Sequence, residues 1–544
     1  MRGHENIVPS VMTSYLDFRD RQACFSRMDE QAFDLAVIGA GITGAGIARD
    51  AALRGLSVAL IEAGDIASGT SSRSSKMIHG GLRYLAHGDI ALVREAALER
   101  QTLRRIAPHL TRYSEFIVPG PKSVVTKMRA GLTAFERLGG VAKSERHRVV
   151  SGEELRGLEP LIDADRYAGA VIYPEFLTND ARLTLANVRS AVEAGAVVLT
   201  HAPVVRIISQ GGQASGVECR GALPGETLGA TVSARTVVNA AGPWVDAVRS
   251  LEAPGSAPQL TLTKGIHIVV RHETLPVRRC TLTIGADKRP VFAVPVQDMT
   301  YIGTTDTFYP DAEVWPRIDR NDVDYLLDAI ASTFSAPRID DADVVAMWAG
   351  VRPLVAQAGK KPSEISRKDE TWIGPSGVRS IAGGKLTAYR KMAERVVDDV
   401  VKDLRIRADK CSTDERPLVG GDVVLADAAA ALPARIAVQE AKRLAELYGS
   451  EATDVAAEIA SEEAAISAEV AQAVQREGAL CLDDYWVRRS ARAWFSGDPV
   501  GESLDQAGIA MAPLLGWDDS RLAAEIQRCR ALHAEARSCL ATPD

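Results

Sequence analysis

The most constraining feature of the 544-residue chain is a glycine pattern between two short apolar stretches. Residues 34–39 predict a buried strand, residues 43–54 predict a helix, and residues 57–62 predict a second strand. These three segments fit within one βαβ unit. The turn after the first strand reads Gly39-Ala-Gly41-Ile-Thr-Gly44, which is the spacing of dinucleotide-binding folds.

Each position in this turn has a physical role in holding a dinucleotide. Gly39 permits the tight turn, Gly41 lets the backbone approach a pyrophosphate, and Gly44 lets helix and strand pack closely. Unpaired N–H groups at the helix N-terminus favour the phosphate charge. Glu62, at the end of the second strand, is placed to bind ribose hydroxyls. This pattern predicts a dinucleotide cofactor, and it leaves NAD and FAD as alternatives.

Composition narrows the class of protein. The net charge of −7 and the predicted pI of about 5.8 argue against a general nucleic-acid binder. The seven cysteines form no CxxC pair, and histidines and cysteines never cluster at ligand spacing, so we expect reduced thiols and no metal site. The sequence has no long apolar run and no signal-peptide pattern. We therefore expect a cytoplasmic protein, or at most one bound peripherally to a membrane.

A polar run downstream of the glycine turn carries a more specific pattern. It reads Gly69-Thr-Ser-Ser-Arg-Ser-Ser-Lys-Met-Ile-His-Gly-Gly-Leu-Arg-Tyr-Leu85 and resembles the signature of FAD-dependent glycerol-3-phosphate dehydrogenases. Further motifs match that family over residues 34 to 400: Asn179-Asp-Ala-Arg-Leu183, Asn239-Ala-Ala-Gly-Pro-Trp244, Lys264-Gly-Ile-His-Ile-Val-Val270, Ile302-Gly-Thr-Thr-Asp306, Gly350-Val-Arg-Pro-Leu354 and Gly383-Gly-Lys-Leu-Thr-Ala-Tyr-Arg390.

The resemblance implies FAD as the cofactor. It implies oxidation of sn-glycerol 3-phosphate to dihydroxyacetone phosphate by hydride transfer to the flavin N5, with electrons passed to a membrane quinone. A protein with this acceptor is expected on the inner face of the cell membrane. The same resemblance leaves a homodimer open as the oligomeric state.

The pattern of elements and the resemblance together predict an α/β (α+β multidomain) fold. We expect a Rossmann-type FAD-binding domain interleaved with a mainly antiparallel substrate domain, followed by an all-helical C-terminal domain. The expected divisions are an N-terminal extension at 1–33, the FAD-binding domain at 34–85, 171–255 and 345–404, the substrate domain at 86–170 and 256–344, and the helical domain at 405–544.

The residues expected to contact FAD are backbone positions that allow close approach and small hydroxyl side chains that donate to phosphate and ring oxygens. A helix beginning near Leu386 would point its positive end at the flavin and stabilise the reduced ring. The full set is Gly39, Gly41, Ile42, Thr43, Gly44, Glu62, Thr70, Ser71, Ser72, Ser75, Gly80, Gly81, Leu82, Ala241, Gly242, Gly384, Lys385, Leu386 and Thr387.

A phosphomonoester substrate needs cationic side chains, and the resemblance supplies candidates. The expected substrate-binding residues are Arg83, Arg352 and Lys385, with Tyr84 and Thr387 as hydrogen-bonding neighbours and Arg367 as a looser match.

Oxidation of a secondary alcohol also needs a group that takes up the hydroxyl proton. His79 and His267 are both candidates for this base, because histidine titrates near neutrality. Arg352 is a third catalytic candidate, which would orient or polarise the alcohol oxygen. The spacing of these residues does not decide among them.

Three other functions remain as alternatives. The chain could act on another polyol phosphate such as erythritol phosphate, pass electrons to oxygen as glycerophosphate oxidases do, or bind flavin without catalysis. Membrane contact is expected through Leu432–Leu447 or Asp484–Phe495, because the second segment combines tryptophans and arginines. The structural alternative for both segments is packing within their own domain.

Overall fold

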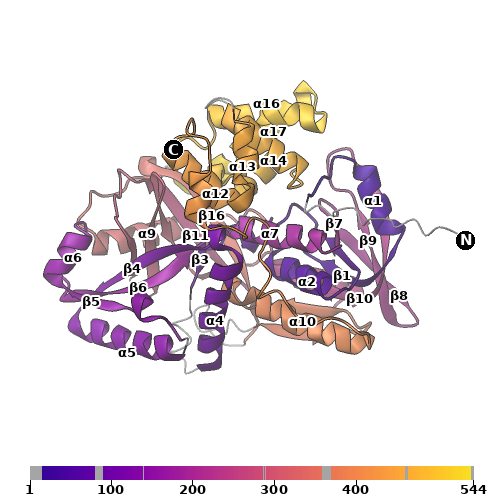
Figure 1. Ribbon diagram of the computed structural model, residues 1–544, viewed down its shortest axis with the longest axis horizontal. Helices are drawn as coiled ribbons and strands as arrows, with labels where there is room; N and C mark the ends of the chain where they lie inside the picture. Colours follow the sequence, from indigo (N-terminus) through magenta and orange to yellow (C-terminus); the bar gives the residue numbers. More distant parts are fainter. Residues whose placement is uncertain are drawn as a thin grey trace, which may run out of the picture.

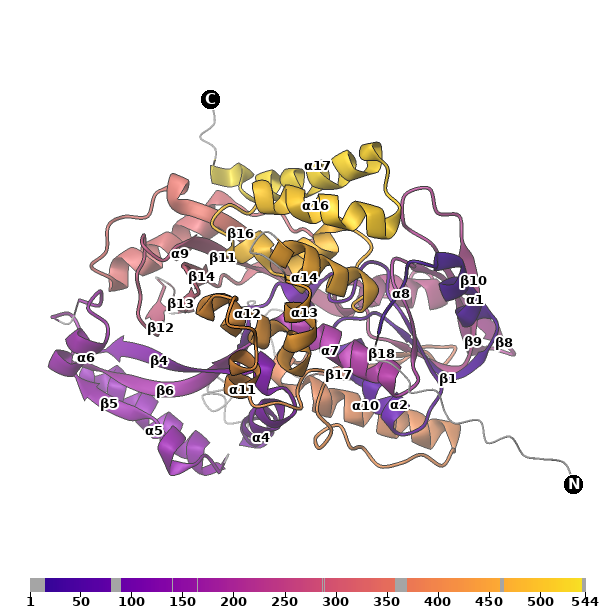
Figure 2. The same cartoon turned by 45° about the horizontal axis from the view of Figure 1, so that its top comes forward.

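The computed structural model describes residues 15–79, 90–138, 140–163, 165–285, 287, 289–357, 369–459 and 464–540. Figure 1 shows two β-sheets side by side, each flanked by helices, with the C-terminal helices lying across the top. Turning the molecule brings this helical layer forward (Figure 2). The architecture confirms the predicted fold class of a mixed α/β chain with a C-terminal helical domain.

The first sheet has eight strands and contains the predicted βαβ unit. Its central strand β1 (Ala32–Ile38) runs parallel to both β10 (Gly229–Asn239) and β2 (Val58–Ile61). The remaining strands are β7 (Val197–Leu199), β8 (Val204–Gln210), β9 (Gln213–Arg220), β17 (Glu370–Ile373) and β18 (Arg379–Ala382). The order is β17-β18-β10-β1-β2-β7; β9 also pairs with β10, and β8 pairs with β9.

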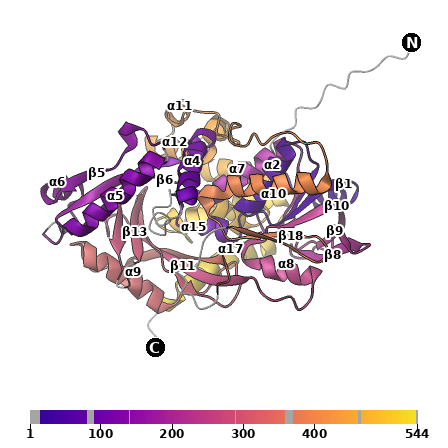
Figure 3. The same ribbon diagram turned by 90° about the horizontal axis from the view of Figure 1, so that it is seen from below.

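Small residues let the helices of the first sheet pack closely. Helix α2 (Ile42–Leu53) lies between α7 (Asp180–Glu193) and α10 (Tyr389–Leu404), as Figure 3 shows. A Cβ at Gly46 of α2 would lie only 2.9 Å from the ring of Tyr389. Helices α1 (Arg21–Asp29) and α8 (Val245–Glu252) also pack against this sheet.

The second sheet has ten strands and is largely antiparallel. Strand β11 (Leu260–Arg271) pairs with both β14 (Met299–Gly303) and β16 (Val344–Val355). The other strands are β3 (Met77–Ile78), β4 (Arg112–Gly120), β5 (Arg148–Ser151), β6 (Gly169–Leu177), β12 (Cys280–Ile284), β13 (Pro290–Val296) and β15 (Thr307–Phe308). The helices connected to this sheet are α4 (Ile90–Ile106), α5 (Lys122–Leu138), α6 (Gly152–Leu158) and α9 (Arg320–Thr333).

Alternation along β11 assigns its two faces to different cores. Ile266 and Ile268 pack into the cluster that contains α9, while Val269 packs into the cluster formed with the C-terminal helices. Successive side chains of a strand point to opposite faces, which explains this division. His267 therefore lies on the face directed toward the C-terminal helices.

The C-terminal part consists of helices packed on both sheets. They are α11 (Leu425–Ala430), α12 (Val438–Tyr448), α13 (Ala452–Ala457), α14 (Ala464–Gln475), a π-helical turn at Asp484–Arg489, α15 (Arg492–Phe495), α16 (Glu502–Leu515) and α17 (Asp519–Ala536). Buried ion pairs join this layer to the first sheet. Asp65, in the loop after β2, pairs with Arg488 and Arg489.

The strands divide between the two sheets differently from the predicted domain boundaries. β3, β6 and β16 all belong to the second sheet, although their residues fall mostly within the ranges 34–85, 171–255 and 345–404 expected for the FAD-binding domain. An apolar stretch predicts a strand but does not specify its partner. The pairing of β16 with β11 was therefore not visible in the sequence.

The described part of the expected N-terminal extension is packed structure rather than a free segment. In α1, Phe25 and Met28 are buried against the first sheet. The backbone N–H of Leu16 donates to the carbonyl of Arg476, so this segment also contacts the C-terminal helices. Residues 15–33 are thus part of the fold.

The expectation that Asp484–Phe495 lies at a bilayer surface is wrong. Trp486 and Trp494 are each only 2% exposed, and Arg488 and Arg489 are buried as well. The indole N–H of Trp486 donates to the carbonyl of Pro499. The aromatic and basic side chains therefore pack inside the protein. No helix among the described residues has the length and apolar content needed to cross a membrane.

Candidate active site

The predicted glycine turn brings backbone segments into direct contact. Gly39 has φ = +102°, and a Cβ there would lie 2.7 Å from the carbonyl oxygen of Ala240. A Cβ at Gly44 would lie 1.9 Å from the carbonyl oxygen of Gly39. Only glycine fits these positions, because any side chain would overlap backbone atoms. The close packing predicted from the spacing is present.

The N-terminus of α2 has the properties of an anion site. Its N-cap residue Gly41 has no side chain to cap the helix, and its first turn contains no acidic residue. The N–H of Ile42 donates to the hydroxyl of Ser71 at 2.9 Å, and Gly41 leaves the space in front of that hydroxyl open. Thr43 and Gly44 follow in the same turn. This arrangement fits a pyrophosphate held by backbone donors.

Glu62 lies where the βαβ pattern places it. Its carboxylate accepts from the N–H of Ala40 at 2.6 Å and from the N–H of Gly64 at 2.9 Å. Burial raises the pKa of Glu62, because little solvent reaches the carboxylate to stabilise its charge. The side chain is therefore anchored at the edge of the glycine turn.

The Gly383-Gly384 motif lies beside the signature run. Lys385 precedes a 3-10 turn (Leu386–Ala388) that leads into α10. The Thr387 hydroxyl donates to the carbonyl of His79 at 3.3 Å across 308 residues of sequence. Gly384 has φ = +76° and leaves no room for a Cβ, which would lie 2.3 Å from the Met392 sulfur. The fold thus joins two of the most specific motifs of the sequence.

The hydroxyl-rich loop, residues 69–75 of the signature run, is held by the second sheet. Thr70 donates to the carbonyl of Val351 at 2.5 Å, and Ser72 donates to the carbonyl of Gly69. The Ser75 hydroxyl bonds to Nε2 of His267 at 2.9 Å. These hydroxyls have protein partners in this structure, so they set the shape of the loop.

His267 is a neutral, buried imidazole. The ring is 1% exposed and stacks on Trp348 with centroids 4.6 Å apart. Burial, assisted by Arg352 and Lys76, holds the pKa of His267 well below its usual value. Its Nδ1 is buried without a hydrogen-bond partner among the described residues. A buried polar atom of this kind is normally satisfied by a ligand or water.

Arg352 lies on the same face of the sheet as His267. In the β11–β16 register Thr263 pairs with Arg352 and His267 pairs with Trp348, so the two side chains are one strand apart. The guanidinium contacts Asp306 at 3.2 Å and the Thr304 hydroxyl at 3.0 Å.

Two glycines leave space for these functional side chains. A Cβ at Gly265 would lie 2.0 Å from Nη2 of Arg352. A Cβ at Gly303 would lie 2.1 Å from Cδ2 of His267. The surrounding sheet is therefore shaped around both side chains.

Other predicted residues lie around this region or outside the described residues. Ala241 and Gly242 follow β10, and Gly242 has φ = +56°. His79 is exposed, in contrast to His267. Six predicted residues fall outside the described residues: Gly80, Gly81, Leu82, Arg83, Tyr84 and Arg367.

The sequence did not identify three side chains that shape the site. Trp348 stacks on His267, and Asp306 holds Arg352. Arg73 is buried behind the loop, over the ring of Trp315 at 4.3 Å. Burial, with a further contribution from Arg488, lowers the pKa of Arg73 to about 9. In the sequence, Asp306 appears only as the last residue of a family motif, and that motif assigned it no role.

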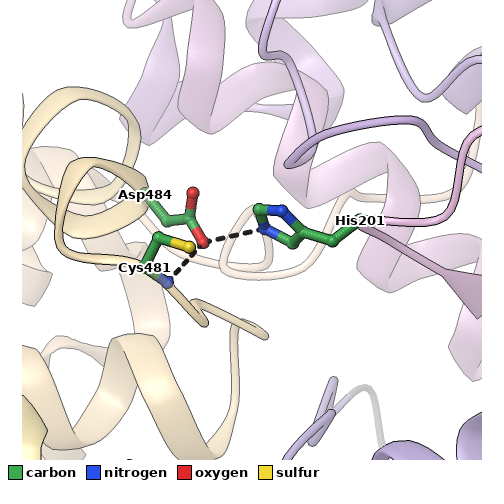
Figure 4. A group of neighbouring side chains, drawn as sticks. All are labelled: His201, Cys481 and Asp484. Carbon is green, nitrogen blue, oxygen red and sulfur yellow. Dashed lines mark hydrogen bonds and ion pairs between the residues drawn. The ribbon is translucent and has the colours of Figure 1, made fainter. Parts of the chain in front are cut away.

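Tertiary structure brings together a group of metal-ligating residue types that spacing did not predict. Figure 4 shows His201 and Cys481 directed toward Asp484. Asp484 accepts from His201 at 3.1 Å, from the N–H groups of Leu480 and Cys481, and from Arg488. Burial raises the pKa of the Cys481 thiol. Because the carboxylate is already saturated by donors and the sulfur is protonated, the group is a hydrogen-bonded contact between domains.

Comparison with known proteins agrees with this geometry. The family described as FAD dependent oxidoreductase matches residues 34–390, and the C-terminal domain of alpha-glycerophosphate oxidase matches residues 411–522. Aerobic glycerol-3-phosphate dehydrogenase of Staphylococcus haemolyticus (strain JCSC1435) is 38% identical over 531 residues, which are 92% of this chain and 94% of that protein. The corresponding enzyme of Bacillus subtilis (strain 168) is 38% identical over 536 residues, which are 94% of this chain and 96% of that protein.

The chain belongs to the FAD-dependent glycerol-3-phosphate dehydrogenase family.

Solved structures extend the agreement to the whole fold. Glycerol-3-phosphate dehydrogenase from Bacillus halodurans, solved with FAD, has a TM-score of 0.82 and 32% identity, covering 97% of this chain and 100% of that one. L-alpha-Glycerophosphate oxidase from Mycoplasma pneumoniae shares the fold with a TM-score of 0.54 at 16% identity, over 71% of this chain and 99% of that one. The family relationship confirms FAD as the predicted cofactor.

Proposed function

We propose that this protein oxidises sn-glycerol 3-phosphate to dihydroxyacetone phosphate with FAD bound at the glycine turn. The observation that carries the proposal is the placement of Arg352 and His267 on one face of β11 and β16, next to the hydroxyl-rich loop. Relatives 38% identical over most of their length are named for this reaction.

The proposed cofactor contacts lie at the N-terminus of α2, at the end of β2 and at the turn before α10. The N-terminus of α2 would hold the pyrophosphate, and Glu62 would bind the ribose hydroxyls. Lys385 and Thr387 stand at the start of the turn before α10, where donors and the helix dipole favour an electron-rich ring. When bound, FAD supplies the hydride acceptor for the substrate carbon.

The proposed substrate contacts are the cations and their neighbours. Arg352 offers a planar fork to the phosphate or polarises the alcohol oxygen, and Asp306 holds it in place. Lys385 adds a second positive charge. Arg83, Tyr84 and Arg367 remain proposed on the resemblance alone.

His267 is the proposed proton acceptor. Its ring is already neutral, and Nδ1 is available inside the site, while Nε2 is bound to Ser75. The depressed pKa makes the ring a weaker base than a free imidazole, so His267 would take up the hydroxyl proton only as the hydride leaves the substrate carbon. His79 is the alternative base.

The proposed electron acceptor is a quinone at the membrane surface. Oxygen is a second candidate, because residues 411–522 match a domain named for an oxidase. The burial of Asp484–Phe495 removes one expected membrane contact and leaves Leu432–Leu447. Within that segment the described structure exposes 79% of Val438.

The deciding experiment is anaerobic reduction of the bound flavin by a panel of polyol phosphates. We expect sn-glycerol 3-phosphate to bleach the flavin absorbance at least tenfold faster than erythritol 4-phosphate or glycerol. Preference for another polyol phosphate would reassign the substrate. An intact yellow cofactor with every compound would favour a binding protein without this chemistry.

The acceptor is tested separately with the reduced enzyme. Rapid reoxidation by a short-chain quinone and slow formation of peroxide in air are expected. Peroxide formation at the rate of turnover, without quinone, would instead identify an oxidase. Sedimentation with anionic lipid vesicles in low salt, compared between the wild type and Val438→Glu, tests the membrane contact.

A further inference from the structure

A cavity lies between the C-terminal helices and one edge of the second sheet, apart from the glycine turn. Its volume is about 140 Å³. Its walls come from the end of β6, the start of β4, α12 and the segment before α15; Figure 1 shows α12 over this edge. At about 30 Å³ per water, it holds several waters or one small organic molecule.

The wall of this cavity has polar atoms without partners. Among the described residues, His109 Nδ1, Thr178 Oγ1, Glu446 Oε1 and Arg492 Nε are all buried and form no hydrogen bond. Buried polar groups are nearly always paired, so several such atoms around one space indicate a bound polar occupant. Burial lowers the pKa of His109 to about 3, which keeps its ring neutral.

The charges of the wall specify the chemistry of that occupant. Arg112 and Glu446 also line the cavity, and neither forms an ion pair with another described residue. Arg443 and Arg492 share Glu469, and together they hold the pKa of Glu469 at about 2 against the opposing effect of burial. The free cation and the N–H of Arg492 favour an oxyanion, whereas the free carboxylate of Glu446 favours a hydroxyl donor.

The cavity wall is connected to the candidate active site. Lys76 in the wall donates to the carbonyl of Ser72 at 3.0 Å, and Tyr301 in the wall donates to the carbonyl of Ser75 at 2.8 Å. Ser75 in turn bonds to His267. An occupant of the cavity would thus contact the residues that hold the hydroxyl-rich loop.

We propose that this cavity binds a small organic anion bearing hydroxyl groups, and that the hydroxyl-rich loop senses its occupancy. The polyol phosphates and the hydroxycarboxylates both have this chemistry. The site is independent of which substrate reduces the flavin, because none of the cavity residues named here is among the proposed substrate contacts.

Binding to the FAD-loaded protein tests the site. The probes are glycerol 2-phosphate, malate and methyl phosphate, measured by calorimetry with the wild type, Arg112→Gln, Thr178→Val and the active-site variant Arg352→Gln. We expect one of the two hydroxylated probes, glycerol 2-phosphate or malate, to bind to the wild type and so to identify the class of ligand. Compared with the wild type, that probe should bind at least tenfold more weakly to Arg112→Gln and several-fold more weakly to Thr178→Val. Arg352→Gln should leave this binding unchanged.

Two matched comparisons sharpen the assignment. Glu446→Gln should weaken a hydroxylated probe but not methyl phosphate, which has no hydroxyl to donate. Arg530→Gln, at an exposed ion pair with Asp505, should change neither. Thr178→Val keeps the shape of the side chain, so a folded, flavin-containing variant is expected even if Arg112→Gln is unstable.

Three results would overturn the proposal. Absence of binding of all probes at 10 mM would mean that the cavity holds only water. If Arg352→Gln abolished binding of the probe and Arg112→Gln did not, the probe would bind at the active site and not in the cavity. Sensing by the loop requires that a saturating probe change the rate of anaerobic flavin bleaching at least twofold in the wild type but not in Arg112→Gln, and an unchanged rate would refute it.

Discussion

Two regions of this molecule bury polar and charged side chains, and they differ in how completely the polar atoms of those side chains are paired. Where the C-terminal helices meet the first sheet, Asp65 accepts from Arg488 at 2.5 Å and from Arg489 at 2.7 and 2.8 Å. At the candidate active site, Nδ1 of His267 is buried without a partner among the described residues.

The difference distinguishes structural polar groups from functional ones. Removing one partner of a fully paired buried charge is strongly destabilising, because the other charge is then left buried and unpaired. A buried polar atom without a partner is a place where a bound molecule completes the hydrogen bonding. Mutations in the first region should therefore act on stability, and mutations in the second should act on the reaction.

The largest expected effect is in the paired region. Asp65→Asn keeps the shape of the side chain but leaves Arg489 without a carboxylate partner and removes one of the three carboxylates paired with Arg488. We expect the free energy of unfolding to fall by about 3–5 kcal/mol, measured by denaturant unfolding or as a lower melting temperature. A melting temperature within one degree of the wild type would show that the two guanidiniums find other partners.

A somewhat smaller effect is expected at the active site. Arg352→Lys replaces the planar fork by a single ammonium, and we expect kcat/KM to fall about 30- to 100-fold, as for loss of a charge-assisted hydrogen bond. The melting temperature should change little. Gly265→Ala offers a matched variant, because its Cβ would displace the Arg352 guanidinium without removing it. Loss of stability with unchanged kcat/KM in both variants would place Arg352 with the structural charges.

The pH dependence of stability tests a third buried polar group, His109 in the wall of the cavity. The pKa of His109 is about 3 when folded, below the usual value of 6.5, so the unfolded chain binds more protons between these values. Stability is therefore fully present above pH 6.5 and is lost as the pH falls, by about 2 kcal/mol for this residue between pH 6.5 and 5. Thermal melting across this range should show a shallower slope in His109→Gln, and parallel slopes would contradict the assignment.

The smallest effect is expected at an exposed pair. Arg530 and Asp505 are 2.8 Å apart, with side chains 42% and 40% exposed. Asp505→Asn should lower the free energy of unfolding by less than about 1 kcal/mol, with an effect that disappears in high salt. A loss comparable to that of Asp65→Asn would break the comparison, because burial would then not determine the strength of an ion pair.

Local patterns predicted the first βαβ unit closely. The helix expected at 43–54 is α2 (Ile42–Leu53), and the strand expected at 57–62 is β2 (Val58–Ile61). The prediction worked because apolar runs and glycines act on neighbouring residues. It failed for Asp484–Phe495, because the same tryptophans and arginines suit both a membrane surface and a buried interface, and only the position of Asp65 decides between them.

The sequence alone determined the class of cofactor and the family, because the glycine turn and the signature run are local patterns with few alternative explanations. Only the tertiary structure decided which buried polar groups are structural and which are functional. His267 acquires its depressed pKa from burial beside Arg352, which is 85 residues away in sequence but one strand away in the sheet. Likewise, the interdomain cavity exists only because distant segments meet around Arg112 and Glu446. Pairing and burial depend on such distant contacts, which no local pattern encodes.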